Sequence, residues 1–400
     1  LITLGSLILV AGSFSDILGR KKVLTGCLIG FGVTSLLCAI APTSLVLIVA
    51  RGLQGIAAAL LVPSSLALII SAFSGAKQSK AIGTWTAWTS IAFIIGPLVG
   101  GMLVDTASWR YVFAINLIPI AITLWLMRSL TVEDTPKKAS VDGLGAVLSV
   151  VGLSGIVYAL IEQGRYGWSL PMIYGTFVAG LSLLAIFVYH EYRSSRPMMP
   201  LGLFEVRNFS AGNIATFFIY GALSLLTFVL VIFLQQVAGY SALAAGAATI
   251  PITIILFLLS PRFGALSGTY GPRLFMSVGP FIIGLGALLM LPVTKEATYL
   301  PYLLGGIMLF GLGLSITVAP LTSAILGSIR PDQAGIGSAI NNAISRIAGL
   351  LFIALIGTFI GTTIDLDGFH TAIMLSAVMF AIGGIVSAIG IRNQTIKTVL

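Results

Sequence analysis

Long apolar segments separated by short polar connections run through the whole chain. Thirteen can be counted among the 400 residues, and all but the first approach the roughly twenty apolar residues that a helix needs to cross a bilayer. A bilayer interior offers no water to an open backbone, so segments of this kind are typical of membrane-spanning α-helices. The pattern predicts an all-α polytopic membrane protein. The segments lie near 1–12, 23–41, 45–72, 81–104, 111–130, 144–161, 171–190, 210–236, 243–260, 274–293, 299–325, 336–362 and 370–391.

The composition supports this prediction. Hydrophobic residues make up 58% of the chain and charged residues only 8%, whereas a soluble domain carries about a quarter charged residues. The two cysteines, Cys27 and Cys38, lie about three helical turns apart in one segment, too far apart for a disulfide. We therefore expect two small packing residues, with neither a disulfide framework nor a metal site.

Positive charges divide unequally between the two sides of the predicted membrane. When the connections are assigned alternately to two sides, sixteen of the 21 lysines and arginines fall on one side and three on the other. The remaining two, Arg51 and Arg346, lie inside segments. Cytoplasmic connections carry such an excess of cations. We therefore expect a multi-pass protein of the cytoplasmic membrane with a cytoplasmic C-terminus, and we expect no nucleic-acid partner.

The first segment is short for a span and begins with Leu1 rather than a methionine. We expect one further span upstream, which would give fourteen spans, of which thirteen are visible in this sequence.

A tight basic turn, Gly12-Ser-Phe-Ser-Asp16-Ile-Leu-Gly19-Arg20-Lys21, joins the first two segments. It resembles motif A of the major facilitator superfamily, the cytoplasmic loop between spans two and three; the alternative is any basic turn between two membrane helices. The resemblance implies a conformational gate formed by Gly12, Asp16, Gly19, Arg20 and Lys21. Our hypothesis is that Asp16 stabilises the outward-open state and does not carry the transported proton.

The same spacing returns later in the chain, where Gly264, Ser267 and Gly271 align with Gly12, Ser15 and Gly19 at an offset of 252 residues. That interval covers eight predicted spans rather than six. It fits the major facilitator fold of two pseudo-symmetric six-helix domains with two helices inserted between them. We expect an N-terminal transporter domain at 1–130, a linker with the two inserted spans at 131–209, and a C-terminal transporter domain at 210–400.

An arginine lies inside the segment 45–72, in the sequence Arg51-Gly-Leu-Gln54-Gly55. Such a residue is costly in a membrane unless it faces a cavity or a partner. Gln54 follows three residues later, on nearly the same helix face. The stretch resembles motif B, whose arginine is linked to proton movement in the family. The alternative is a structural arginine that reaches the membrane surface.

The segment 81–104 ends in Gly96-Pro97-Leu-Val-Gly100-Gly101, which resembles the antiporter motif C, with Ala92 in place of the first glycine of that motif. The resemblance implies export; the alternative is an ordinary proline kink. The sequence Trp109-Arg110-Tyr-Val-Phe113 resembles the signature that follows motif C in drug exporters.

Further polar and aromatic residues inside segments are candidates for lining a substrate cavity. Gln235 and Gln236 belong to a stretch that resembles a signature of fourteen-span exporters, and Asn342 and Arg346 lie one turn apart. The alternatives are aromatic residues of the membrane interface for the tryptophans and helix–helix hydrogen bonds for the polar residues. The candidates are Trp85, Trp88, Asn213, Tyr220, Gln235, Gln236, Asn342 and Arg346.

Together these stretches resemble the fourteen-span drug:proton antiporter branch of the superfamily. The resemblance implies proton-coupled export of small amphipathic or cationic molecules by alternating access, by a protein that acts as a monomer. The expected energy source is the proton motive force, without a cofactor, and the acidic coupling residue is expected in the missing first span. The alternatives are export of a lipid or metabolite, a membrane-embedded enzyme, and a sensor that does not transport. We expect no enzyme, because no cluster of acid, base or nucleophile lies at one depth.

Overall fold

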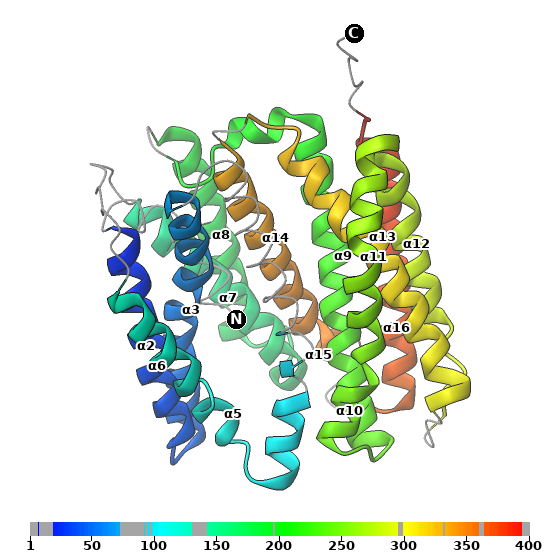
Figure 1. Ribbon diagram of the computed structural model, residues 1–400, viewed down its shortest axis with the longest axis horizontal. Helices are drawn as coiled ribbons and strands as arrows, with labels where there is room; N and C mark the ends of the chain where they lie inside the picture. Colours follow the sequence, from blue (N-terminus) through cyan, green and yellow to red (C-terminus); the bar gives the residue numbers. More distant parts are fainter. Residues whose placement is uncertain are drawn as a thin grey trace. The chain divides into compact units, whose positions relative to one another are not determined.

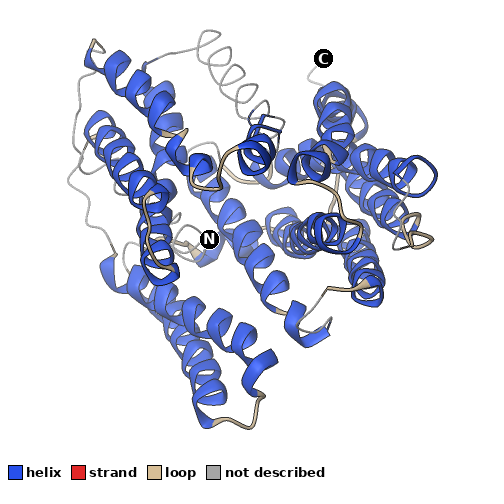
Figure 2. Cartoon of the chain, turned by 90° about the horizontal axis from the view of Figure 1, so that it is seen from below, coloured by secondary structure: helices blue, strands red, loops and turns tan. Residues whose placement is uncertain are grey.

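The computed structural model describes residues 7, 19–72, 92, 95–96, 98–129, 142–194, 197–294, 299–330, 333–359 and 364–393. Throughout these ranges the regular structure is helical and contains no strand (Figure 2). The predicted all-α class is confirmed for this part of the chain.

The chain separates into two compact units. Unit 1 comprises Leu1–Tyr158 and Tyr174–Pro200, and unit 2 comprises Ala159–Ile173 and Leu201–Leu400. The helical hairpin between the two repeats is therefore shared, because its two ends belong to unit 1 and its tip belongs to unit 2. The predicted boundaries of three domains stay a prediction.

The helices of the first half are labelled in Figure 1. They are α2 (Arg20–Ala39), α3 (Ser44–Ala72), α5 (Tyr111–Ala114), α6 (Leu117–Arg128), α7 (Gly143–Tyr166) and α8 (Pro171–Arg193). Helix α2 packs against α3, α5 and α6.

The second half continues with further helices, shown from green to red in Figure 1. Within unit 2, α9 packs against α14 and α16, and α13 packs against α11 and α12. The elements are η1 (Leu201–Glu205), α9 (Arg207–Ile232), η2 (Phe233–Val237), α10 (Ala242–Ala248), α11 (Ile250–Tyr270), α12 (Pro272–Leu288), η3 (Tyr299–Leu303), α13 (Leu304–Leu326), α14 (Ala334–Ala354), α15 (Ile356–Phe359) and α16 (Leu366–Gly390).

Ten helices in the described residues are long and apolar enough to span a membrane, and Pro272–Leu288 is a shorter apolar helix. Two of the thirteen predicted segments, 1–12 and 81–104, lie largely outside the described residues. The number of thirteen spans therefore stays a prediction.

Helices approach each other closely at positions where a glycine leaves no side chain between the two backbones. A Cβ added at Gly306 of α13 would lie 2.6 Å from the backbone oxygen of Gly286 in α12. A Cβ at Gly180 of α8 would lie 2.8 Å from the backbone oxygen of Gly152 in α7. In a bilayer, where lipid is as apolar as leucine, helices associate through such close packing.

The repeat predicted from the glycine spacing is visible in the backbone. Gly19 precedes α2 with φ 94°, and Gly271 precedes α12 with φ 84°, in a region that is open almost only to glycine. Gly32 of α2 contacts α6, and Gly284, at the same register of α12, contacts α16. The two repeats therefore share a backbone turn and a packing register.

Candidate functional site

A polar network links α3 to α2 in unit 1, and its members are buried except for Arg51, which is exposed. Arg51 Nη1 donates a hydrogen bond of 2.6 Å to Gln54 Oε1, and Gln54 Nε2 donates one of 2.6 Å to Ser35 Oγ. Gln54 is 3% exposed, and Ser35 and Cys38 are fully buried. The prediction that Arg51 and Gln54 share a helix face is confirmed, and Gly55 beside them is also buried. We refer to Ser35, Cys38, Arg51 and Gln54 as the Arg51 network.

An aromatic ring also contacts the guanidinium. The centroid of the Phe113 ring lies 5.4 Å from Arg51 Cζ, within the range of a cation–π interaction. The neighbouring Arg110 donates to the backbone oxygen of Ala41 at 3.2 Å and lies over the ring of Trp109. The signature stretch after motif C therefore contributes contacts to the same unit, one of them directly to Arg51.

The Arg51 network has an apolar counterpart in unit 2. The offset of 252 residues maps its four members onto apolar side chains and a glycine. Two of these counterparts also lie side by side in the structure, because a Cβ added at Gly306 would lie 2.6 Å from Met290 Cγ. The counterparts of Ser35, Cys38, Arg51 and Gln54 are Ala287, Met290, Leu303 and Gly306.

Of the motif A residues, Gly19 is buried at the start of α2, and Arg20 and Lys21 form the first turn of that helix. Gly12 and Asp16 lie outside the described residues. The gating role predicted for this motif stays a prediction.

The motif C residues are partly described. Gly96 and Gly100 are helical, and a Cβ added to either would meet no heavy atom within 4 Å in the described part of the chain. Gly101 is buried, and Pro97 lies outside the described residues. Close packing at Gly96 and Gly100 is thus not seen here, and the export role stays a prediction.

Helices α9 and α14 of unit 2 are joined by amide hydrogen bonds. Asn341 Nδ2 donates to Asn213 Oδ1 at 3.1 Å and to Thr216 Oγ1 at 2.8 Å. Asn213 is 2% exposed and also donates to the backbone oxygen of Phe209. These contacts correspond to the helix–helix alternative from the sequence, while cavity lining by Asn213 stays a prediction.

Tyr220 lies in the same helix, α9, and is half-buried. Arg346 and Asn342 are exposed, and Asn342 donates to the backbone oxygen of Ser338 at 3.0 Å. Gln235 and Gln236 are exposed on the π-helical turn η2. Trp85 and Trp88 lie outside the described residues.

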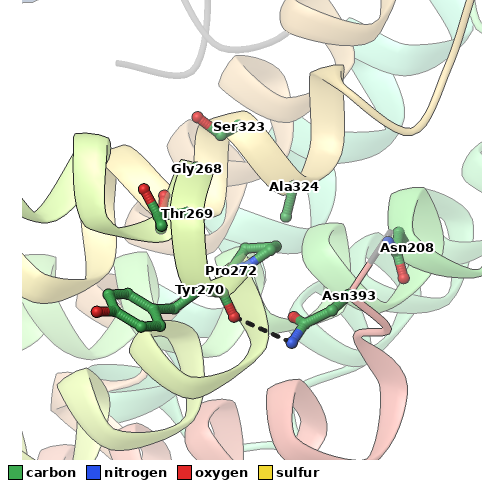
Figure 3. A pocket seen from close by; sticks show the side chains of 10 residues that line it. Asn208, Gly268, Thr269, Tyr270, Pro272, Ser323, Ala324 and Asn393 are labelled. Carbon is green, nitrogen blue, oxygen red and sulfur yellow. Dashed lines mark hydrogen bonds between the residues drawn. The ribbon is translucent and has the colours of Figure 1, made fainter. Parts of the chain in front are cut away.

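A cavity of about 420 Å³ lies at the end of α11, beside the glycine turn that repeats motif A. Its side chains are mainly neutral and polar, and Asn393 Nδ2 donates to the Tyr270 carbonyl at 3.2 Å (Figure 3). Asn393 Oδ1 accepts from the Arg273 N–H at 3.1 Å. None of the cavity-lining residues predicted from the sequence lies in it, so we assign it to the packing of this turn.

Sequence reasoning missed several polar groups. Ser35 and Asn341 resemble ordinary small polar residues of a membrane helix, and only the partner helix reveals their roles. It also missed His190, whose Nε2 lies 2.9 Å from both carboxylate oxygens of Asp142. Burial of Asp142 acts to raise the pKa of its carboxyl, but the Gly145 N–H and His190 outweigh burial and hold that pKa below its usual range. In the described residues no group of three histidine, cysteine, aspartate or glutamate side chains is arranged so that it could hold a metal ion.

Comparison with protein families gives a match over residues 1–353 to the model described as Major Facilitator Superfamily. The chain belongs to this superfamily. It is 34% identical over 359 residues to the multidrug resistance protein Stp of Mycobacterium tuberculosis, covering 88% of this chain and 65% of Stp. It is 28% identical over 387 residues to the methylenomycin A resistance protein of Streptomyces coelicolor, covering 96% of this chain and 81% of that protein.

Among solved structures, the chain resembles a POT family transporter crystallised with a thioalcohol-conjugated peptide. The TM-score is 0.69 at 13% identity, over 96% of this chain and 85% of that one. This likeness shows the fold alone. Together with the ten apolar helices, the superfamily membership makes the chain a multi-pass membrane protein.

Proposed function

We propose that the protein is a secondary active exporter of the fourteen-span drug:proton antiporter branch. It moves small amphipathic or cationic compounds outward by alternating access, driven by inward proton flow. The observation that carries this proposal is the Arg51 network. In this network the guanidinium of Arg51, a cation in an otherwise apolar helix, contacts two neutral partners, Gln54 and the ring of Phe113.

Neutral partners leave the guanidinium with its full positive charge. A membrane cation is costly unless it is paired or solvated, so its retention favours a functional role. Such a cation stabilises an ionised carboxylate on another helix in one conformation and releases it for protonation in the other. The names of the two relatives, both resistance proteins, support drugs as substrates and export as the direction.

The test uses cells that express the gene encoding this chain, loaded with a panel of cationic and neutral dyes. We expect faster dye efflux than in control cells, and abolition of that difference by a protonophore. Arg51→Leu should remove the difference, whereas Arg128→Leu, at the end of α6, should keep it. Efflux that continues after the proton gradient has collapsed, or that Arg51→Leu leaves intact, would contradict the proposal.

The proposed orientation places the C-terminus and the 131–142 connection in the cytoplasm and the turn between α7 and α8 outside. Single cysteines at Ser169 and Lys137, in a variant without Cys27 and Cys38, separate the two sides. We expect a membrane-impermeant maleimide added to intact cells to label position 169 only. Labelling of position 137 from outside would reverse the orientation.

A further inference from the structure

Three titratable side chains come together where α7 begins and α8 ends, all in unit 1. Asp142 immediately precedes α7, and its Oδ1 accepts the Gly145 N–H at 2.9 Å. His190 and Glu191 lie in the last turn of α8, and Glu191 Oε2 accepts the Met199 N–H at 2.7 Å. The cluster therefore ties together the start of α7, the end of α8 and the segment that follows it.

Glu191 is buried, with 2% of its surface exposed. Its second oxygen, Oε1, has no hydrogen-bond partner in the described part of the chain. A Cβ added at Gly145 would lie 2.6 Å from Asp142 Oδ2 and 3.0 Å from Glu191 Oε1, so both carboxylate oxygens border the same point. The unpartnered oxygen thus lies inside the cluster and borders the same space as the Asp142 carboxylate.

Two carboxylates this close do not both ionise readily, because each charge disfavours the other. A single proton removes the repulsion and gives Oε1 a hydrogen bond at the same time. Asp142 already accepts from Gly145 and lies beside His190, so its charge is the better stabilised of the two. The proton therefore belongs on Glu191, with Asp142 as the acceptor.

We propose that Asp142, His190 and Glu191 form a proton-binding site that latches the α7–α8 hairpin at this end. Binding transfers a proton from water to Glu191 Oε1, and the new O–H donates to Asp142 Oδ2. Release returns the proton to water and leaves a second negative charge beside Asp142. The start of α7 then separates from the end of α8.

Apolar residues of the same elements form a cluster of their own. Ala146, Phe187 and Met198 are buried in it, with Leu148 and Met199 partly buried against them. Arg193 is exposed and lies over the ring of Tyr189 instead. In the described part of the chain, Asp142 and His190 are thus the titratable groups that face Glu191.

The hairpin connects this site to the rest of the molecule. Its tip belongs to unit 2, where Gln163 Nε2 donates to Thr358 Oγ1. A latch at the ends of α7 and α8 therefore acts on an element shared by both units. It is separate in sequence from the Arg51 network and goes beyond the proposed export function.

The first test is infrared spectroscopy of the purified full chain. We expect a C=O band of a neutral carboxylic acid at neutral pH that disappears in Glu191→Gln. The band should remain in Glu205→Gln, which alters an exposed carboxylate. Absence of any Glu191-dependent band across the pH range of the folded protein overturns the proposal.

The second test needs no change at Glu191. Spin labels at Leu144 and Tyr192, both exposed, report the distance between the start of α7 and the end of α8. In otherwise wild-type protein without native cysteines, we expect one short distance that lengthens and broadens as pH rises. In Glu191→Gln the amide replaces the O–H donor, so the short distance should persist at high pH. A wild-type distance that does not depend on pH overturns the latch.

Discussion

The helix pairs α2–α3 of unit 1 and α12–α13 of unit 2 share a backbone plan but differ in their chemistry. Both pairs begin after a glycine with positive φ, Gly19 or Gly271. Both place a glycine at the same register against the last helix of their repeat. In unit 1 the facing positions form the Arg51 network, whereas in unit 2 they are apolar and closely packed.

The difference shows how one backbone plan accommodates two kinds of side-chain packing. Interhelical packing requires small residues at fixed spacing, and both copies keep that requirement. In unit 2 the counterpart of Gln54 is Gly306, which lets α12 and α13 approach closely. In unit 1 Gln54 binds Ser35 of α2, and the network that it forms also holds the charge of Arg51.

The largest effect is expected from adding a side chain to the close contact in unit 2. Gly306→Ala places a Cβ 2.6 Å from the Gly286 oxygen, and overpacking of this kind costs about 1–3 kcal/mol or more. Gly305→Ala is the matched control, since no heavy atom of the described residues lies within 4 Å of its Cβ position. Thermal unfolding in detergent should separate the two variants. Equal stability would show that the helices are not in close contact.

A smaller effect is expected at the two glycines with positive φ. Any other residue there is strained by about 1–3 kcal/mol. Gly19→Ala and Gly271→Ala should both destabilise the protein, and at Gly271 the added Cβ would also collide with the side chain of Asn393. Unfolding temperatures of the two variants, each compared with the wild type, check this expectation. An unchanged unfolding temperature in either variant would show that its turn is not strained.

The smallest effect is expected within the Arg51 network. Interhelical hydrogen bonds in membranes are worth on average about 0.6 kcal/mol. Gln54→Leu loses one such bond, to Ser35 of α2, and also the bond from Arg51 within α3, so it should destabilise by about 1–2 kcal/mol.

A double-mutant cycle with Ser35→Ala sharpens this prediction. Because either single variant already breaks the Ser35–Gln54 hydrogen bond, adding Ser35→Ala to Gln54→Leu should cost less than Ser35→Ala alone. Strict additivity would show that the Ser35–Gln54 bond contributes nothing.

Local patterns in the sequence predicted a good part of this structure. Glycine spacing revealed the repeat, because positive φ restricts the residue type at a turn regardless of its surroundings. The pair Arg51 and Gln54 was predicted because helical periodicity fixes which neighbours share a face.

Contacts across helices were not predicted. Nothing local distinguishes Ser35 from other small polar residues of membrane helices, and Asn341 was passed over for its neighbour Asn342. Asp142 and His190 are 48 residues apart, and each alone resembles a polar residue at a helix end. Only packing of the hairpin brings them together. One local feature of the sequence pointed to that site. Asp142 precedes Gly145 by three residues, the spacing at which an aspartate before a helix accepts a backbone N–H, and it accepts the N–H of Gly145.

The proposed function assigns proton coupling to the Arg51 network and not to its counterpart in unit 2. The most direct test measures dye-driven proton movement in liposomes containing the purified protein, with a pH-sensitive fluorophore inside. The decisive variant gives unit 1 the residues of unit 2: Ser35→Ala, Cys38→Met, Arg51→Leu and Gln54→Gly. We predict that it folds and binds dye but that its proton flux falls to the level of empty liposomes. A folded variant with wild-type proton flux would contradict the account.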